Sequence, residues 1–69
     1  MQDYTAVIKQ NGDWWVGWVE EVAGVNCQES SREELIESLQ VTLSEAIEFN
    51  RSEAREFAGS GFSRETISA

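Results

Sequence analysis

The stretch at residues 14–19, WWVGWV, constrains the fold of this 69-residue chain more than any other feature. In an extended strand, successive side chains point to opposite faces. The two sets are Trp14, Val16 and Trp18 on one face and Trp15, Gly17 and Val19 on the other. Both faces are apolar, and a chain this short can supply only one layer to cover a sheet. The second face therefore needs cover from a partner.

We expect the face that contains Gly17 to be the inner one, because a residue without a side chain leaves room for a helix to approach. A bulge at this glycine is equally permissible. The other face then exposes two indoles with Val16 between them, on the order of several hundred Å² of apolar surface. The opposite assignment would leave Trp15 and Val19 exposed instead. Either assignment predicts a homo-oligomer, at least a dimer, or another protein partner.

The flanking segments predict an antiparallel sheet. Residues 3–10 alternate as a strand with one apolar face, and Asn11-Gly12-Asp13 follows as a hairpin turn. Asn-Gly favours such a turn because both residues tolerate positive φ. The returning strand should run from Trp14 to about Glu21. After a turn at Gly24, residues 25–28 form a short third strand.

The periodicity changes to that of a helix after Ser31. Residues 31–34, SREE, form a capping box: the Ser31 hydroxyl accepts from the Glu34 amide, and the Glu34 carboxylate reaches back. A helix thus begins at Arg32. Its apolar stripe recurs at spacings of three and four residues, at Leu35, Ile36, Leu39, Leu43, Ala46 and Ile47.

The apolar pattern weakens at Asn50. Either the helix continues to Ala58, or a second short helix starts after Asn50; we favour the continuous helix. Such a helix would be ~40 Å long and would overhang strands of ~27 Å. The sequence therefore predicts an α+β fold, a three-stranded antiparallel meander with one long helix across it (β-β-β-α), over residues 1–58. Residues 59–69 form a flexible tail or a short final strand.

Thirteen acidic against five basic residues give a net charge of −8. Because nucleic-acid affinity depends largely on Lys and Arg, we expect no direct nucleic-acid binding. The same charge would speed encounter with a small basic protein, although it serves solubility equally well.

The residues that most enzymes use are absent or scattered. The chain has no histidine, so no Ser-His or Cys-His pair can form, and the single Cys27 excludes an internal disulfide. We expect Cys27 to be a half-buried structural thiol. Asp13, Glu20 and Glu21 are the only carboxylates on the predicted sheet that could hold metal ions, and they do not converge. We expect no enzyme activity, no catalytic or metal residues and no cofactor; a metal-dependent nuclease is the remote alternative.

No apolar stretch approaches the ~20 residues that span a bilayer, and the N-terminal residues lack a secretion signal. We therefore expect no membrane association and a cytoplasmic location.

Two segments together resemble the HicB-like antitoxin family: YTAVIKQNGDWWVGWVEEVAGVNCQ and SSREELIESLQVTLSEAIEF. Glu20 and Ala23 depart from the family, which usually has prolines in this turn, and Glu29 stands where glycine is common. The resemblance implies a partial RNase H-like fold and an oligomeric antitoxin that covers the active site of a HicA-type RNase toxin. After Gly61 only eight residues follow, too few for the helix-turn-helix that many members carry, so we do not expect autorepression.

These considerations select candidate contact residues. For a basic toxin they are the indole face and four carboxylates expected near one end of the sheet: Trp14, Val16, Trp18, Glu20, Glu21, Glu33 and Glu34. Phe49 and Phe57 on the overhanging helix are the candidate oligomer contacts. An orphan homo-oligomeric scaffold without a toxin is the alternative function.

Overall fold

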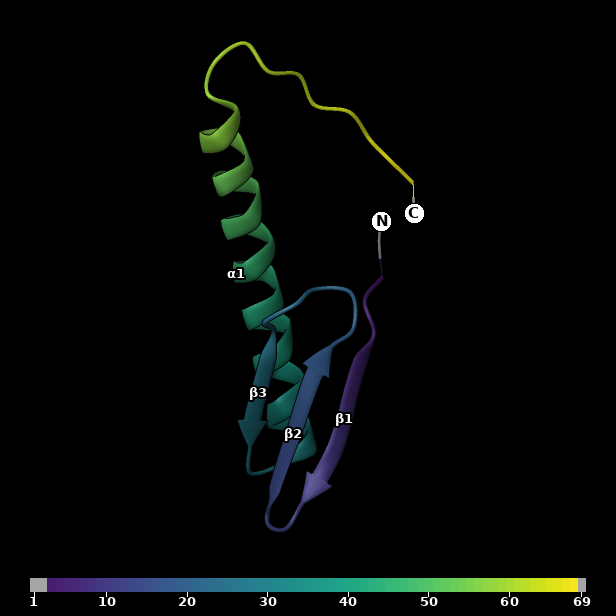
Figure 1. Ribbon diagram of the computed structural model, residues 1–69. Coiled ribbons are helices and arrows are strands. Elements are labelled where there is room, and N and C mark those ends of the chain that lie inside the picture. Colours follow the sequence, from purple (N-terminus) through teal and green to yellow (C-terminus); the bar gives the residue numbers. More distant parts are fainter. Residues whose placement is uncertain (1–2, 69) are drawn as a thin grey trace.

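The computed structural model describes residues 3–68, and it contains one sheet and one helix (Figure 1). The strands are β1 (Ala6–Asn11), β2 (Trp14–Val19) and β3 (Asn26–Glu29), and the helix is α1 (Arg32–Ala58). All strand pairs are antiparallel, in the order β1-β2-β3. The predicted β-β-β-α arrangement of an α+β domain is confirmed.

The hairpin between β1 and β2 has a two-residue loop. Asn11 pairs with Trp14, which leaves Gly12 and Asp13 in the loop. Gly12 has a φ of 64°, whereas Asp13 does not adopt a positive φ. Glycine with positive φ at the first central position is the requirement of a type II′ turn. The hairpin is confirmed, but Asn11 is the last residue of β1 and not part of the turn, contrary to the sequence prediction.

The strands begin and end slightly differently from the prediction. β1 starts at Ala6 rather than residue 3, because the Thr5 amide donates to Glu21 Oε1 at 2.8 Å. β2 stops at Val19, whose amide donates to the Val25 carbonyl at 3.1 Å across the following loop. β3 is displaced by one residue, to 26–29.

Helix α1 covers the face of the sheet that contains Gly17, as predicted. Gly17 pairs with Ile8 and Cys27 in an uninterrupted register, so the strand has no bulge there. A Cβ at this position would lie 2.9 Å from Leu39 Cδ1 and 3.2 Å from Leu35 Cδ2. The helix can pack this closely only because the position carries no side chain.

The core is small. Its buried apolar side chains among residues 3–68 are Val19, Val25, Leu35 and Leu39. Partly buried residues, among them Trp15 and Ile8, pack around them. So few buried side chains provide limited stabilisation for a chain of 69 residues.

The helix is capped at both ends. Ser31 Oγ accepts a hydrogen bond from the Glu34 amide at 3.2 Å, which confirms half of the predicted capping box. The other half is wrong, since Glu34 Oε2 instead accepts from the Ser30 hydroxyl at 3.2 Å. At the other end, the Gly59 amide donates to the Arg55 carbonyl at 3.1 Å, and Gly59 has a φ of 73°.

The helix is continuous through Asn50, as favoured from the sequence, and its last turns extend beyond the sheet (Figure 1). Its 27 residues give a length of ~40 Å, against ~20 Å for the six residues of β2. All helical residues after Ile47 are exposed. The radius of gyration is 15.1 Å, whereas a compact domain of this length would have about 11 Å.

The segment after the helix forms no strand within the described residues. Residues 60–68 are exposed and have neither helical nor strand structure, so the alternative of a final strand is wrong for them. Ala69, the last residue of that predicted segment, lies outside the described residues, as do residues 1 and 2.

The close packing at Gly17 predicts that G17A destabilises the fold by about 1–3 kcal/mol, because Leu39 and Ile8 would have to shift to admit the methyl group. Urea unfolding followed by circular dichroism measures this. In the L39V background, which removes the nearest methyl, the penalty of G17A should be smaller. An equal penalty in both backgrounds would contradict the steric explanation.

Candidate functional site

The face of the sheet opposite α1, here called the outer face, is left uncovered by the helix. Its strand residues form three cross-strand rows: Val7–Trp18–Asn26, Lys9–Val16–Gln28 and Asn11–Trp14. The helix contacts β2 and β3 from the other side. The parity predicted for the indole face is therefore correct, and Trp14, Val16 and Trp18 lie together on it.

Apolar side chains on the outer face are substantially exposed. Trp14 is 49% exposed and Trp18 is 45% exposed, and Val7 lies directly across from Trp18. A shallow hollow of about 310 Å³ lies along the β2–β3 pair, and its lining includes Val16, Trp18, Asn26 and Gln28. This combination of large apolar side chains and a concave strip is typical of protein-binding surfaces.

Val7 is a residue of this face that the sequence analysis did not select. Its alternation with Thr5 and Lys9 placed it on the less apolar parity of its strand. The register across β1 and β2 shows that this parity faces the same side as Trp18. Counting residues back from the hairpin turn pairs Val7 with Trp18. This pairing would have identified Val7 as a residue of the outer face.

The outer face is almost uncharged, although the chain has a net charge of −8. Lys9 is the single charged residue among the strand positions of its three rows. Interface centres are usually depleted of charge, because burying an unpaired carboxylate is costly. A partner can therefore cover this face without burying any carboxylate of the strands.

The four carboxylates selected from the sequence do not lie near one end of the sheet, so this expectation is wrong. Glu20 and Glu21 follow β2, whereas Glu33 and Glu34 open α1 just after β3. Since β3 runs antiparallel to β2, the end of β2 and the start of α1 lie at opposite ends of the sheet (Figure 1), and so do the two pairs. The chain reverses direction between the two pairs, and this reversal carries them to different ends.

Glu21 has a structural role of its own. Its Oε1 accepts from the Thr5 amide at 2.8 Å, and the neighbouring Glu20 amide donates to the Thr5 carbonyl at 3.0 Å. The hydrogen bond from the Thr5 amide lowers the pKa of the Glu21 carboxyl below its ordinary value. Glu21 therefore fastens the segment before β1 to the loop after β2.

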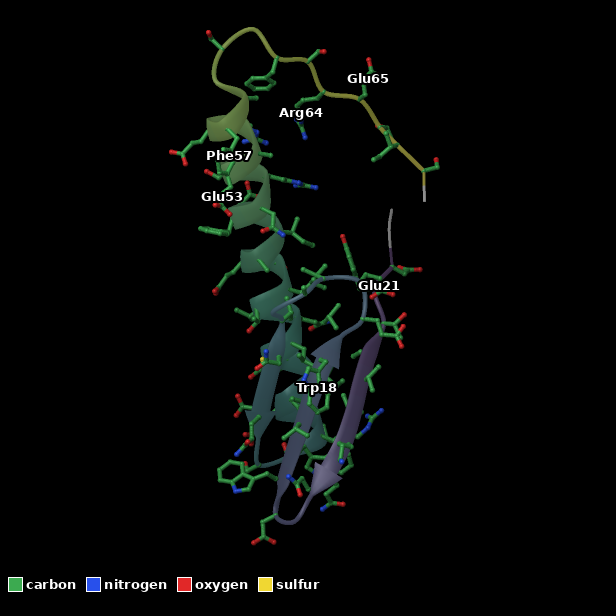
Figure 2. All side chains as sticks on the ribbon, in the orientation of Figure 1. Trp18, Glu21, Glu53, Phe57, Arg64 and Glu65 are labelled. Atoms are coloured by element: carbon green, nitrogen blue, oxygen red, sulfur yellow. The ribbon has the colours of Figure 1, made fainter. Side chains whose placement is uncertain are left out.

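Phe49 and Phe57, the candidate oligomer contacts, lie on the overhanging part of α1. They are 62% and 85% exposed. Glu53 lies between them at i+4 spacing, and Figure 2 shows Glu53 and Phe57 pointing to the same side of the helix. This surface lies on the helix and is separate from the outer face of the sheet.

The groups that could carry chemistry are dispersed. Cys27 is partly buried on the inner side, with its Sγ 3.4 Å from Thr42 Oγ1. Asp13 lies in the β1–β2 turn, at the opposite end of β2 from Glu20 and Glu21. In the part of the chain that the structure describes, no three residues of the metal-ligating types come together.

Within residues 3–68, α1 is too polar to cross a membrane. Comparisons with protein-family models, curated proteins and solved structures found no match for this chain. The site must therefore be interpreted from its own geometry.

The Glu21–Thr5 hydrogen bond predicts an acid-dependent loss of stability. The pKa of Glu21 is lower in the folded state, so its contribution is complete above the unfolded-state pKa of about 4.3 and is lost as pH falls through the lower folded value. E21Q should therefore be less stable than the parent at neutral pH, and this difference should shrink at low pH.

Urea unfolding at several pH values checks this, together with an NMR titration of the Thr5 amide, whose shift should follow the same ionisation. A difference in stability that does not change with pH would contradict this role for Glu21.

Proposed function

We propose that this chain is a protein-binding module of the antitoxin type, which neutralises a small basic HicA-type RNase by covering its active site. The observation that carries this proposal is the uncovered outer face, with Trp14 and Trp18 half-exposed on either side of Val16. The identity of the partner comes from the resemblance to HicB-like antitoxins. The protein would act in the cytoplasm, through binding alone and without direct contact to nucleic acid.

The outer face suits the centre of such an interface. Tryptophan is enriched among the residues that dominate binding energy, and it contributes most where surrounding contacts exclude water. Val7 and Val16 extend the apolar area around the indoles, and neutral polar side chains such as Asn26 and Gln28 form its border. This is an apolar centre with a polar rim.

The distribution of charge suits a basic partner. The carboxylates lie at both ends of the sheet and on the helix, outside the outer face, so they can attract a cationic protein without being buried. Charges at such rim positions raise the association rate and make it depend on salt. The centre and rim of the surface therefore support the same type of partner.

Replacing the two outer indoles tests the proposal. W14T/W18T should weaken binding to a small basic HicA-type RNase by about thirtyfold or more, because each indole is a candidate hot spot. Threonine suits an exposed strand position, and neither indole is buried, so the fold should persist. Calorimetric titration and an RNase inhibition assay measure the loss.

The matched control is V41T, which replaces an apolar residue that is 58% exposed on α1, away from the outer face. It should leave affinity unchanged. Full inhibition by W14T/W18T, or equal losses in both variants, would contradict docking through the outer face.

The carboxylates give a second test, because the candidate pairs lie at opposite ends of the sheet. Neutralising the end that borders the toxin should slow association by about threefold or more at low salt, with little change in dissociation. E33Q/E34Q tests the helix end, and E20Q tests the loop end while it leaves the Glu21–Thr5 hydrogen bond intact.

Stopped-flow association at several salt concentrations measures the rates, and E53Q/E56Q on the overhanging helix serves as control. Equal rates for all of these variants and the parent would exclude electrostatic attraction through either end.

A homo-oligomeric scaffold without a toxin is the second candidate. The near absence of charge on the outer face favours it, since two copies of a chain with net charge −8 can meet there without opposing carboxylates. Sedimentation at micromolar concentration distinguishes the two surfaces. If two copies meet through the outer face, W14T/W18T should be monomeric. If they meet through the overhanging helix, F49A/F57A should be monomeric instead. An oligomer that fails to bind any small basic RNase would favour the scaffold.

A further inference from the structure

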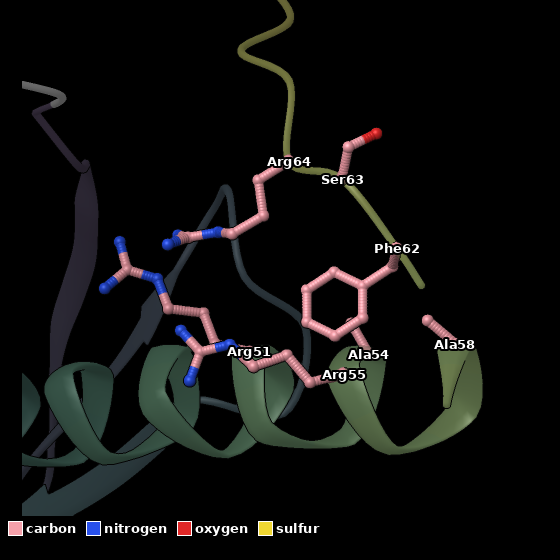
Figure 3. A pocket seen from close by; sticks show the side chains of 7 residues that line it. All are labelled: Arg51, Ala54, Arg55, Ala58, Phe62, Ser63 and Arg64. Atoms are coloured by element: carbon pink, nitrogen blue, oxygen red, sulfur yellow. The ribbon is translucent and has the colours of Figure 1, made fainter. Parts of the chain in front are cut away.

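A separate feature lies at the far end of the molecule, where the chain reverses after α1. Residues 62–64 pass beside the last turns of the helix and border an open hollow of about 210 Å³ (Figure 3). Its lining consists of Arg51, Ala54, Arg55 and Ala58 from the helix and Phe62, Ser63 and Arg64 from the following segment.

The hollow gathers positive charge. Three of the five basic residues in the sequence line it, although acidic residues outnumber basic ones by thirteen to five. Arg51 Nη1 lies 3.9 Å from Glu48 Oε2, and both side chains are mostly exposed. Among residues 3–68, neither Arg55 nor Arg64 has a carboxylate within 4.0 Å. Three neighbouring guanidinium groups with so few negative charges close to them repel one another, and a bound anion would relieve that repulsion.

The other side of the hollow is apolar. The ring of Phe62 lies over Ala54, whereas the arginine side chains extend away from the ring, toward the other end of the hollow (Figure 3). Phe62 is 46% exposed, so one part of its surface packs on the helix and another remains open. The small side chains of Ala54 and Ala58 provide the space in front of the ring. The hollow thus has a cationic half and an aromatic half.

We propose that this hollow binds a small phosphate monoester that carries a ring, with its phosphoryl group on Arg55 and Arg64 and its ring against Phe62. Arg51 adds positive charge beside them. A monoester carries a charge of about −1.5 to −2 at neutral pH and has three acceptor oxygens, which match the forked donors of several guanidinium groups. This site is independent of the proposed toxin-binding function.

The size and charge of the molecule favour a small ligand over a polymer. A volume of about 210 Å³ admits a phosphoryl group and one ring. The acidic remainder of the chain would repel an extended nucleic acid, whereas its effect on a small anion is screened within ~8 Å at physiological salt.

Binding would also connect the segment after the helix to the helix itself. Within residues 3–68 no hydrogen bond involves residues 60–68, and the ring of Phe62 lies beside Ala54 of the helix (Figure 3). Arg55 belongs to the helix and Arg64 to the segment, so one phosphoryl group that contacts both would join them. Ligand should therefore slow tryptic cleavage after Arg64.

Binding is measured by NMR titration of the full chain with each of three probes: phenyl phosphate, inorganic phosphate and phenol. Phenyl phosphate should bind about tenfold more tightly than inorganic phosphate, and phenol should not bind. R55Q and R64Q should each weaken phenyl phosphate binding by about tenfold, whereas R32Q at the start of α1 should not. Adenosine monophosphate and phosphotyrosine then distinguish a nucleotide from a phosphoamino acid as the source of the ring.

The aromatic half of the hollow is tested by a separate pair of matched variants, F62A and F57A. F62A should reduce the preference for phenyl phosphate over inorganic phosphate to about threefold or less, whereas F57A, on the side of α1 that faces away from the hollow, should retain it. The variants lie outside the core, so circular dichroism should be unchanged. The proposal is overturned by equal losses in R32Q and R55Q, by no saturation up to about 10 mM phenyl phosphate, or by tryptic cleavage after Arg64 that the ligand does not slow.

Discussion

The packing of α1 against the backbone of β2 at Gly17 is the contact on which the rest of the structure depends. Because this position has no side chain, Leu35 and Leu39 reach the strand itself, and an added Cβ would lie 2.9 Å from Leu39 Cδ1. These leucines form the core together with Val19 and Val25. The same contact decides which face of β2 is covered, and therefore which tryptophans remain accessible.

One helix on a three-stranded sheet leaves two kinds of uncovered surface. The outer face is apolar and nearly without charge, and every residue of α1 after Ile47 is exposed. The outer face is uncovered because α1 packs on the other face of the sheet, and the overhang arises because the helix is about twice as long as the strands it crosses. A domain with so few buried side chains gains stability if a partner covers either surface.

Charge is distributed unevenly over the domain, and each region therefore favours a different kind of partner. Carboxylates surround the outer face without occupying it, which suits a basic protein or a second copy. Three arginines gather at the far end of the helix with an aromatic ring beside them, which suits a small anion. The two regions lie at different ends of an elongated molecule, so occupation of one does not block the other.

The sequence by itself determined the local elements: the hairpin, the helix start at Arg32 and the alternation of WWVGWV follow from short-range rules of turns, caps and periodicity. It also predicted the correct inner face, because only glycine permits so close a helix contact. Tertiary structure alone decided how distant segments meet. It separated Glu20 and Glu21 from Glu33 and Glu34, engaged Glu21 with Thr5, and returned Arg64 to the side of Arg55. These placements depend on chain reversal and packing, which no local pattern contains.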